Sequence, residues 1–131
     1  ISGNNVYYLT SKKSSKEDIV PLQDDFDKIL QATPVAFKDK ATGNPGIGYI
    51  AEDFEDAGLH NLLVYENGEL VSLRYDLISV YNLEIIKKQQ KLLEGQQQQI
   101  EAEKAKNKEL ENELITLKER LSALEAMMGN K

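Results

Sequence analysis

The stretch LENELITLKERLSALEAMM, residues 110–128, decides the architecture of this chain. Its leucines recur at alternating spacings of three and four residues, as at the a and d positions of a coiled coil. Position a falls on Leu93, Ile100, Asn107, Leu114, Leu121 and Met128, and position d falls on Gln96, Glu103, Leu110, Leu117 and Leu124. From Leu110 to Met128, every a and d position is therefore apolar, whereas Gln96, Glu103 and Asn107 interrupt the seam before it. This pattern predicts one helix from about Asp76 to Met128, roughly 80 Å long, that forms a coiled coil.

The charges beside this apolar seam indicate how the helices associate. In a parallel coiled coil, each g residue faces the e residue five positions on in a neighbouring chain. These pairs are all opposite in sign: Lys106–Glu111, Glu113–Lys118 and Arg120–Glu125. The pattern predicts a parallel homo-oligomer. Leucine at both a and d leaves the number of strands open, and Asn107 at an a position leans weakly towards two.

Residues 1–75 have a different composition, because they hold all three prolines and six of the eight glycines. Turn residues between short apolar runs are typical of a mixed α and β domain. The run Asn67-Gly68 between two apolar segments predicts a β-hairpin. So few residues make a small core, which association would help to stabilise. The expected elements are a strand at 6–9, a helix from Pro21 to before Pro34, strands at 35–37 and 46–50, an acidic helix at 52–56, and hairpin strands at 62–65 and 70–73.

The composition also excludes several kinds of site. With no cysteine, the chain has no disulfide, no cysteine ligand and no cysteine nucleophile, and His60 is its only histidine. The net charge of −6 divides into −5 for residues 1–75 (seven basic, twelve acidic) and −1 for residues 76–131 (nine basic, ten acidic). Neither part has the basic excess of a nucleic-acid binder, and no apolar run is long enough for a bilayer. We therefore expect no cofactor, metal, nucleic acid or membrane.

One pair of residues near the start of the chain has the composition of a catalytic dyad. Ser11 and Lys16 lie five positions apart, with Lys12 and Lys13 between them. A serine nucleophile needs a base, and a lysine can serve when its amine is neutral. Lowering the pKa of a lysine from its unperturbed value of about 10.4 to about 7 requires that the ammonium be destabilised by roughly 4–5 kcal/mol. Serine and lysine at this spacing are also common by chance, so a solvated loop is the simpler interpretation of this stretch alone.

Four motifs in order resemble the C-terminal intramolecular chaperone domain of phage tail spikes and tail fibres, a family of self-cleaving serine peptidases. They are TSKKSSKEDI (10–19), GIGYIAED (46–53), VSLRYDLI (71–78) and the long C-terminal helix. The large share of coiled coil is most similar to the neck appendage proteins of short-tailed phages. Lys12 and Ser14 stand where family members often have Asp and Arg, and Glu52-Asp53 stands where Gln-Glu is usual.

The resemblance implies a homotrimer that promotes folding of a preceding β-helical spike and then releases itself. It would cut the Thr10–Ser11 bond, with Ser11 as nucleophile and Lys16 as base. Residues 1–10 would end the spike, residues 11–75 would form an α+β chaperone head, and residues 76–131 the helix. The implied partners are two further copies and the preceding spike domain. The implied setting is the host cytoplasm during virion assembly, with the released chaperone absent from the mature virion.

Two other classes of function remain open at this point. The first is a non-enzymatic coiled-coil oligomerisation module of a larger structural protein. The second is an adaptor whose coiled coil binds a cellular partner. Both share the small head and the long helix with the self-cleaving chaperone. Release of a fragment from the precursor would distinguish the chaperone from the oligomerisation module, and an adaptor would stay attached to its parent.

Overall fold

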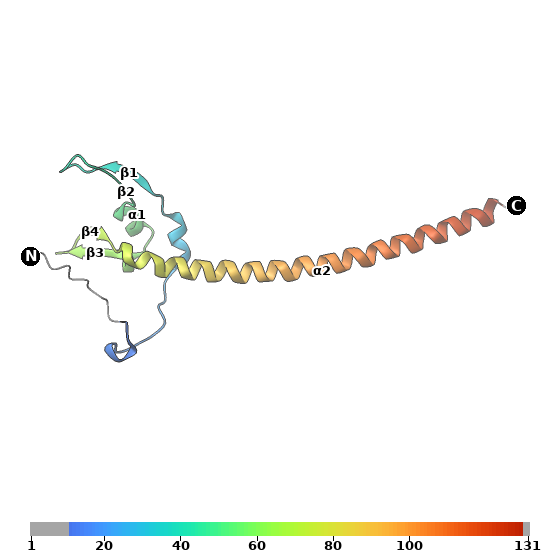
Figure 1. Ribbon diagram of the computed structural model, residues 1–131, viewed down its shortest axis with the longest axis horizontal. Helices are drawn as coiled ribbons and strands as arrows, with labels where there is room; N and C mark the ends of the chain where they lie inside the picture. The colour runs from blue at the N-terminus through green and yellow to red at the C-terminus, as the bar shows by residue number, and fades with distance from the viewer. Residues whose placement is uncertain (1–10, 130–131) are drawn as a thin grey trace, which may run out of the picture.

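The computed structural model describes residues 11–129 as a small head from which one long helix projects (Figure 1). This confirms the mixed α and β class with a long C-terminal helix; the strand expected at 6–9 lies outside the described residues. Short 3₁₀ helices are labelled η. In chain order the elements are η1 (Lys13–Ser15), η2 (Phe26–Gln31), β1 (Val35–Lys38), β2 (Pro45–Gly48), α1 (Ala51–Asp56), η3 (His60–Leu62), β3 (Leu63–Glu66), β4 (Glu69–Leu73) and α2 (Tyr75–Gly129).

The strands form two separate antiparallel hairpins, β1–β2 and β3–β4. In the second hairpin Leu63 lies opposite Leu73, and the connecting residues Asn67 and Gly68 have φ angles of 52° and 78°. Positive φ at both central residues is what a two-residue hairpin turn requires. The hairpin predicted from Asn67-Gly68 is confirmed. An isolated two-stranded hairpin is only marginally stable, so each depends on the rest of the head.

Strand β2 is shorter than the sequence predicts, because the backbone of Tyr49 forms hydrogen bonds with a side chain instead of with strand β1. The Tyr49 N–H donates to the Tyr75 hydroxyl at 2.9 Å, and that hydroxyl donates to the Tyr49 carbonyl at 3.3 Å. A Cβ atom built at Gly48 would lie 2.6 Å from the same hydroxyl. Gly48 therefore allows the first residue of α2 to approach and end the strand, and α1 begins at Ala51.

The helix predicted to begin at Pro21 is wrong. Residues 16–25 are irregular, and only a 3₁₀ helix, η2, forms between Phe26 and Gln31. Of its residues, Ile29 alone is buried. A helix starting five residues earlier would have had no apolar surface to cover, since residues 11–23 are all exposed. Propensity at a first helical position does not hold a helix that lacks tertiary contacts.

The core of the head takes residues from six elements. Two of these residues come from the start of α2. Tyr81 and Ile85 are 2% and 7% exposed and pack with residues of η2, α1, η3 and the β3–β4 hairpin. The first three turns of α2 therefore complete the head. The buried set is Ile29, Phe54, Leu59, Leu62, Leu63, Leu73, Tyr81 and Ile85.

Beyond the head, α2 continues alone as a gently bowed rod (Figure 1). All residues from 86 to 129 are exposed, including the five leucines predicted at a and d positions of the last heptads. These leucines, at 110, 114, 117, 121 and 124, keep between 51% and 59% of their surface in water. A stripe of this kind is an unpartnered apolar surface. None of the helices in residues 11–129 has the length and apolarity of a membrane span.

Candidate active site

Ser11 and Lys16 flank the short helix η1. Its backbone is closed by the Ser15 N–H donating to the Lys12 carbonyl at 3.0 Å and the Lys16 N–H donating to the Lys13 carbonyl at 3.1 Å. The Ser15 hydroxyl also donates to the Lys12 carbonyl, at 2.7 Å. A 3₁₀ helix rises about 2.0 Å per residue, whereas a strand rises about 3.3 Å. The turn therefore shortens the backbone path between Ser11 and Lys16.

The dyad lies on an exposed segment, which we call the arm and define as residues 11–23. Every residue of the arm is exposed, and Figure 1 shows its η1 turn standing away from both hairpins. Thr10, on the other side of the predicted scissile bond, lies outside the described residues. Within residues 11–129 of one chain, no element shields Ser11 or Lys16 from water. The described residues of one chain therefore do not bury Lys16 as a neutral lysine base would require.

The arm meets the head at Asp24. The Asp24 carboxylate accepts hydrogen bonds from the Tyr81 hydroxyl of α2 and, at 3.2 Å, from the Asn61 amide of η3. It also accepts the Asp25 N–H at 2.8 Å. Partial burial alone would raise the pKa of Asp24, but these hydrogen bonds hold it below its usual value. Burial, reinforced by the bond to Asp24, raises the pKa of Tyr81 to about 12.

This cluster went unrecognised in the sequence. Tyr81 lies 57 positions from Asp24, and Asn61 lies 37 positions from it. A carboxylate, an amide and a phenol at such separations carry no local pattern that would reveal their contact. Only the burial of Tyr81 on the head-facing side of α2 explains why the three polar groups meet.

Comparison with protein families identifies the head. Residues 11–63 match the family model described as chaperone of endosialidase. This part of the chain, 53 of its 131 residues, is similar to that family. The match begins at Ser11 and includes Lys16, Asp24 and the GIGYIAED motif. The family's name also marks it as a peptidase family. Comparison with curated proteins and with solved structures gave no match.

The acidic helix of this chaperone domain has a structural explanation. Acidic side chains in the first turn of α1, such as Glu52 and Asp53, are favoured by the positive end of the helix. Glu55 accepts a hydrogen bond of 2.6 Å from the Tyr65 hydroxyl, which ties α1 to β3 and raises the pKa of Tyr65. Within residues 11–129, no group of three potential ligands is arranged to hold a metal ion. His60 is exposed at the start of η3.

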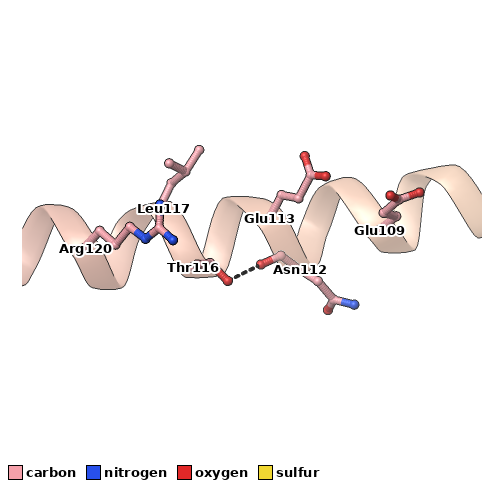
Figure 2. A pocket seen from close by; sticks show the side chains of 6 residues that line it. All are labelled: Glu109, Asn112, Glu113, Thr116, Leu117 and Arg120. Atoms are coloured by element: carbon pink, nitrogen blue, oxygen red, sulfur yellow. Dashed lines mark hydrogen bonds between the residues drawn. The ribbon is translucent and has the colours of Figure 1, made fainter.

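Surface depressions also occur along α2, away from the chaperone head. One, of about 470 Å³, is lined by Glu109, Asn112, Glu113, Thr116, Leu117 and Arg120. Figure 2 shows Glu113 and Leu117 projecting from one side of the helix while the Asn112 amide points to the other. The only bond drawn there is intrahelical, from the Thr116 hydroxyl to the Asn112 carbonyl at 3.1 Å. These depressions are spaces between side chains of a single helix, unlike the enclosed pockets that bind small ligands.

Proposed function

We propose that this chain is an intramolecular chaperone that promotes trimerisation and folding of a preceding β-helical tail spike and then cuts itself off. The observation that supports it best is the family match beginning at Ser11, because cleavage of Thr10–Ser11 would make that residue the new N-terminus. The site of action is the host cytoplasm during virion assembly, and the released chaperone is absent from the mature virion. The likeness to neck appendage proteins stays a prediction.

The proposed cleavage uses two side chains of the arm. Neutral Lys16 Nζ accepts the proton of the Ser11 hydroxyl as Oγ attacks the Thr10 carbonyl carbon. The C–N bond then breaks, the proton passes to the Ser11 amine, and an ester joins the Thr10 carbonyl to Ser11 Oγ. Water hydrolyses that ester and leaves a Thr10 carboxylate and a Ser11 hydroxyl. The net reaction is hydrolysis of the Thr10–Ser11 peptide bond by one water molecule.

Assembly would supply the burial that the described residues of one chain do not provide. Ser11 and Lys16 are exposed in the single chain. A lysine becomes a base only where its ammonium is destabilised by burial or by nearby cations. The arm carries further cations at Lys12 and Lys13. Burial would come from neighbouring chains or from a folded spike packed against the arm. Cleavage would then report that assembly is complete.

The proposed oligomer is a parallel homotrimer. The exposed leucine stripe of α2 supports association, and the opposite charges at g and e support a parallel arrangement. The family supports three chains over the two favoured by Asn107. A coiled-coil module without chemistry is the alternative function, because it would use the same stripe.

Substitution of the dyad tests the proposal. In a chain with a protein tag ahead of Ile1, Ser11→Ala and Lys16→Ala should each leave the precursor whole and assembled. Lys16→Arg should fail too, because a guanidinium does not give up its proton. Ser14→Ala, in the same arm, is the matched control and should cut normally. A denaturing gel follows the fragment, and mass spectrometry should find Ser11 at its N-terminus.

Three results would overturn or revise this proposal. A wild-type precursor that stays whole in its assembled state would leave the structural module as the better description. Efficient cutting by Lys16→Ala would remove lysine from the mechanism while keeping the serine. A fragment that begins at Ser14 or Ser15 would move the scissile bond.

A further inference from the structure

Asp24 lies where the exposed arm ends and the packed head begins. All residues before it in the described chain are exposed, whereas Phe26 and Ile29 after it contact the core. Its carboxylate receives hydrogen bonds from two elements distant in sequence, α2 and η3. A carboxylate held by several donors is fixed in position, and charge-assisted bonds of this kind are the stronger ones.

We propose that Asp24 and Tyr81 are positioning residues for self-cleavage, which set the direction in which the arm leaves α2. This inference rests on the proposed function and names the part of the fold that holds the dyad in place. Neither residue touches the reacting atoms. They act through the arm, by fixing its root to the helix on which the chains assemble.

The contacts around Tyr81 explain why the root follows α2 rather than the hairpins. Tyr81 is 2% exposed, and its ring meets that of Phe26 edge-on with centroids 5.1 Å apart. One residue further along η2, Asp27 forms an ion pair of 3.0 Å with Lys88 of α2. The root of the arm is thus held at two points on the same helix, about two turns apart. When helices assemble, the starting points of the arms become fixed relative to one another.

The expected loss of cleavage rate distinguishes a positioning anchor from a simple tether. Thirteen residues join Ser11 to Asp24, and they span at most about 43–47 Å. If the anchor were lost, the chain would be held at the buried Ile29 at the latest, so the tether would lengthen to eighteen residues at most. For a flexible chain, effective concentration falls as about the −3/2 power of length, so cleavage would slow only about 1.6-fold. Loss of orientation costs far more, since a misplacement of about 1 Å can reduce a rate by up to about 100-fold.

The decisive variant is Tyr81→Phe, which keeps the buried ring and removes only the hydroxyl. Its matched control is Tyr65→Phe, which removes another tyrosine–carboxylate bond, to Glu55, that does not hold the arm. Asp24→Asn keeps an acceptor oxygen for the Tyr81 hydroxyl and serves as the conservative rescue. Each variant is compared with wild type at equal assembly, checked by sedimentation and circular dichroism.

Two measurements are made on each variant. Because the chain lacks cysteine, spin labels can be placed at Gln23→Cys, beside the anchor, and at Lys91→Cys, on the exposed side of α2 away from the predicted seam. Labelled chains in the Ser11→Ala background are diluted with unlabelled ones. The distribution of distances between the two labels is then recorded by pulsed electron paramagnetic resonance. The cleavage rate is measured separately without labels.

We expect Tyr81→Phe to widen the distance distribution at least twofold and to slow cleavage about tenfold. Tyr65→Phe should change neither the distance distribution nor the cleavage rate. Asp24→Asn should keep a distribution and a rate close to those of wild type. An unchanged distribution in Tyr81→Phe would overturn the anchor. A widened distribution with less than a twofold loss of rate would reduce it to a tether and overturn positioning. A wild-type chain that never cuts refutes the proposed function, whereas the distance distribution still decides whether Tyr81 holds the arm.

Discussion

Replacing Leu114, Leu117 and Leu121 with aspartate would test whether cleavage depends on assembly. These side chains are 52%, 59% and 56% exposed on the single helix. Burying the exposed half of a leucine contributes about 1 kcal/mol, so nine leucines in three chains contribute about 9 kcal/mol. A loss of that size lowers the association constant by about six orders of magnitude. Aspartate adds a further penalty, because a carboxylate in the seam would be desolvated without a partner.

The assay combines sedimentation velocity with a denaturing gel over a range of protein concentrations. The matched control places three aspartates at Ile115, Thr116 and Ser122, which occupy outward-facing b and c positions in the same turns. Ile115 is 55% exposed, so exposure alone does not distinguish it from the seam leucines. The seam variant should be monomeric, with slow cleavage that recovers at high concentration, and the control should behave as wild type.

A monomeric seam variant that cuts at the wild-type rate would refute the reasoning, because the dyad would then be complete within one chain. The substitutions lie more than 40 Å along the helix from Ile85, at about 1.5 Å per residue, so a direct effect on the arm is excluded. A stable two-chain species at every concentration would refute the trimer.

Two further predictions concern the head. Tyr81 has a pKa of about 12 when folded and about 10 when unfolded, so the unfolded chain loses this proton first as pH rises. Stability should therefore fall by about 2–3 kcal/mol between pH 10 and 12 in wild type, and urea unfolding of Tyr81→Phe should lack that decrease. Gly48→Ala should destabilise the head by about 1–3 kcal/mol, because its Cβ would lie 2.6 Å from the Tyr75 hydroxyl. In thermal unfolding, Tyr75→Phe should relieve part of that loss, and strictly additive effects would contradict the clash.

Local patterns predicted the elements that local chemistry determines. The turn at Asn67-Gly68 needs two residues with positive φ, and that requirement is visible in the sequence. The long helix follows from an uninterrupted run without proline, and it begins at Tyr75, one residue before the predicted start. Strand β1 and the acidic helix α1 also form where short apolar or acidic runs predicted them.

Contacts distant in sequence decided what local patterns could not. Pro21 favoured a helix start, yet residues 11–23 are exposed in the described part of the chain, and Asp24 bonds with Tyr81 instead. Tyr49 fits a strand by type, but its backbone bonds with the Tyr75 hydroxyl. Ser11 and Lys16 lie on an exposed arm, in agreement with the solvated loop that this stretch alone indicated. Their pairing as a dyad stays a prediction.

The use of Tyr81 and Ile85 to close the core has a consequence for timing during synthesis. The head cannot finish folding until Ile85 has left the ribosome, by which time everything upstream has been translated. At about 5–20 residues per second, the exposed part of α2 from residue 86 to residue 129 then follows within roughly 2–9 s. Closure of the head and emergence of the associating helix therefore fall in the same few seconds. A nascent spike would meet its chaperone only once its own chain is fully made.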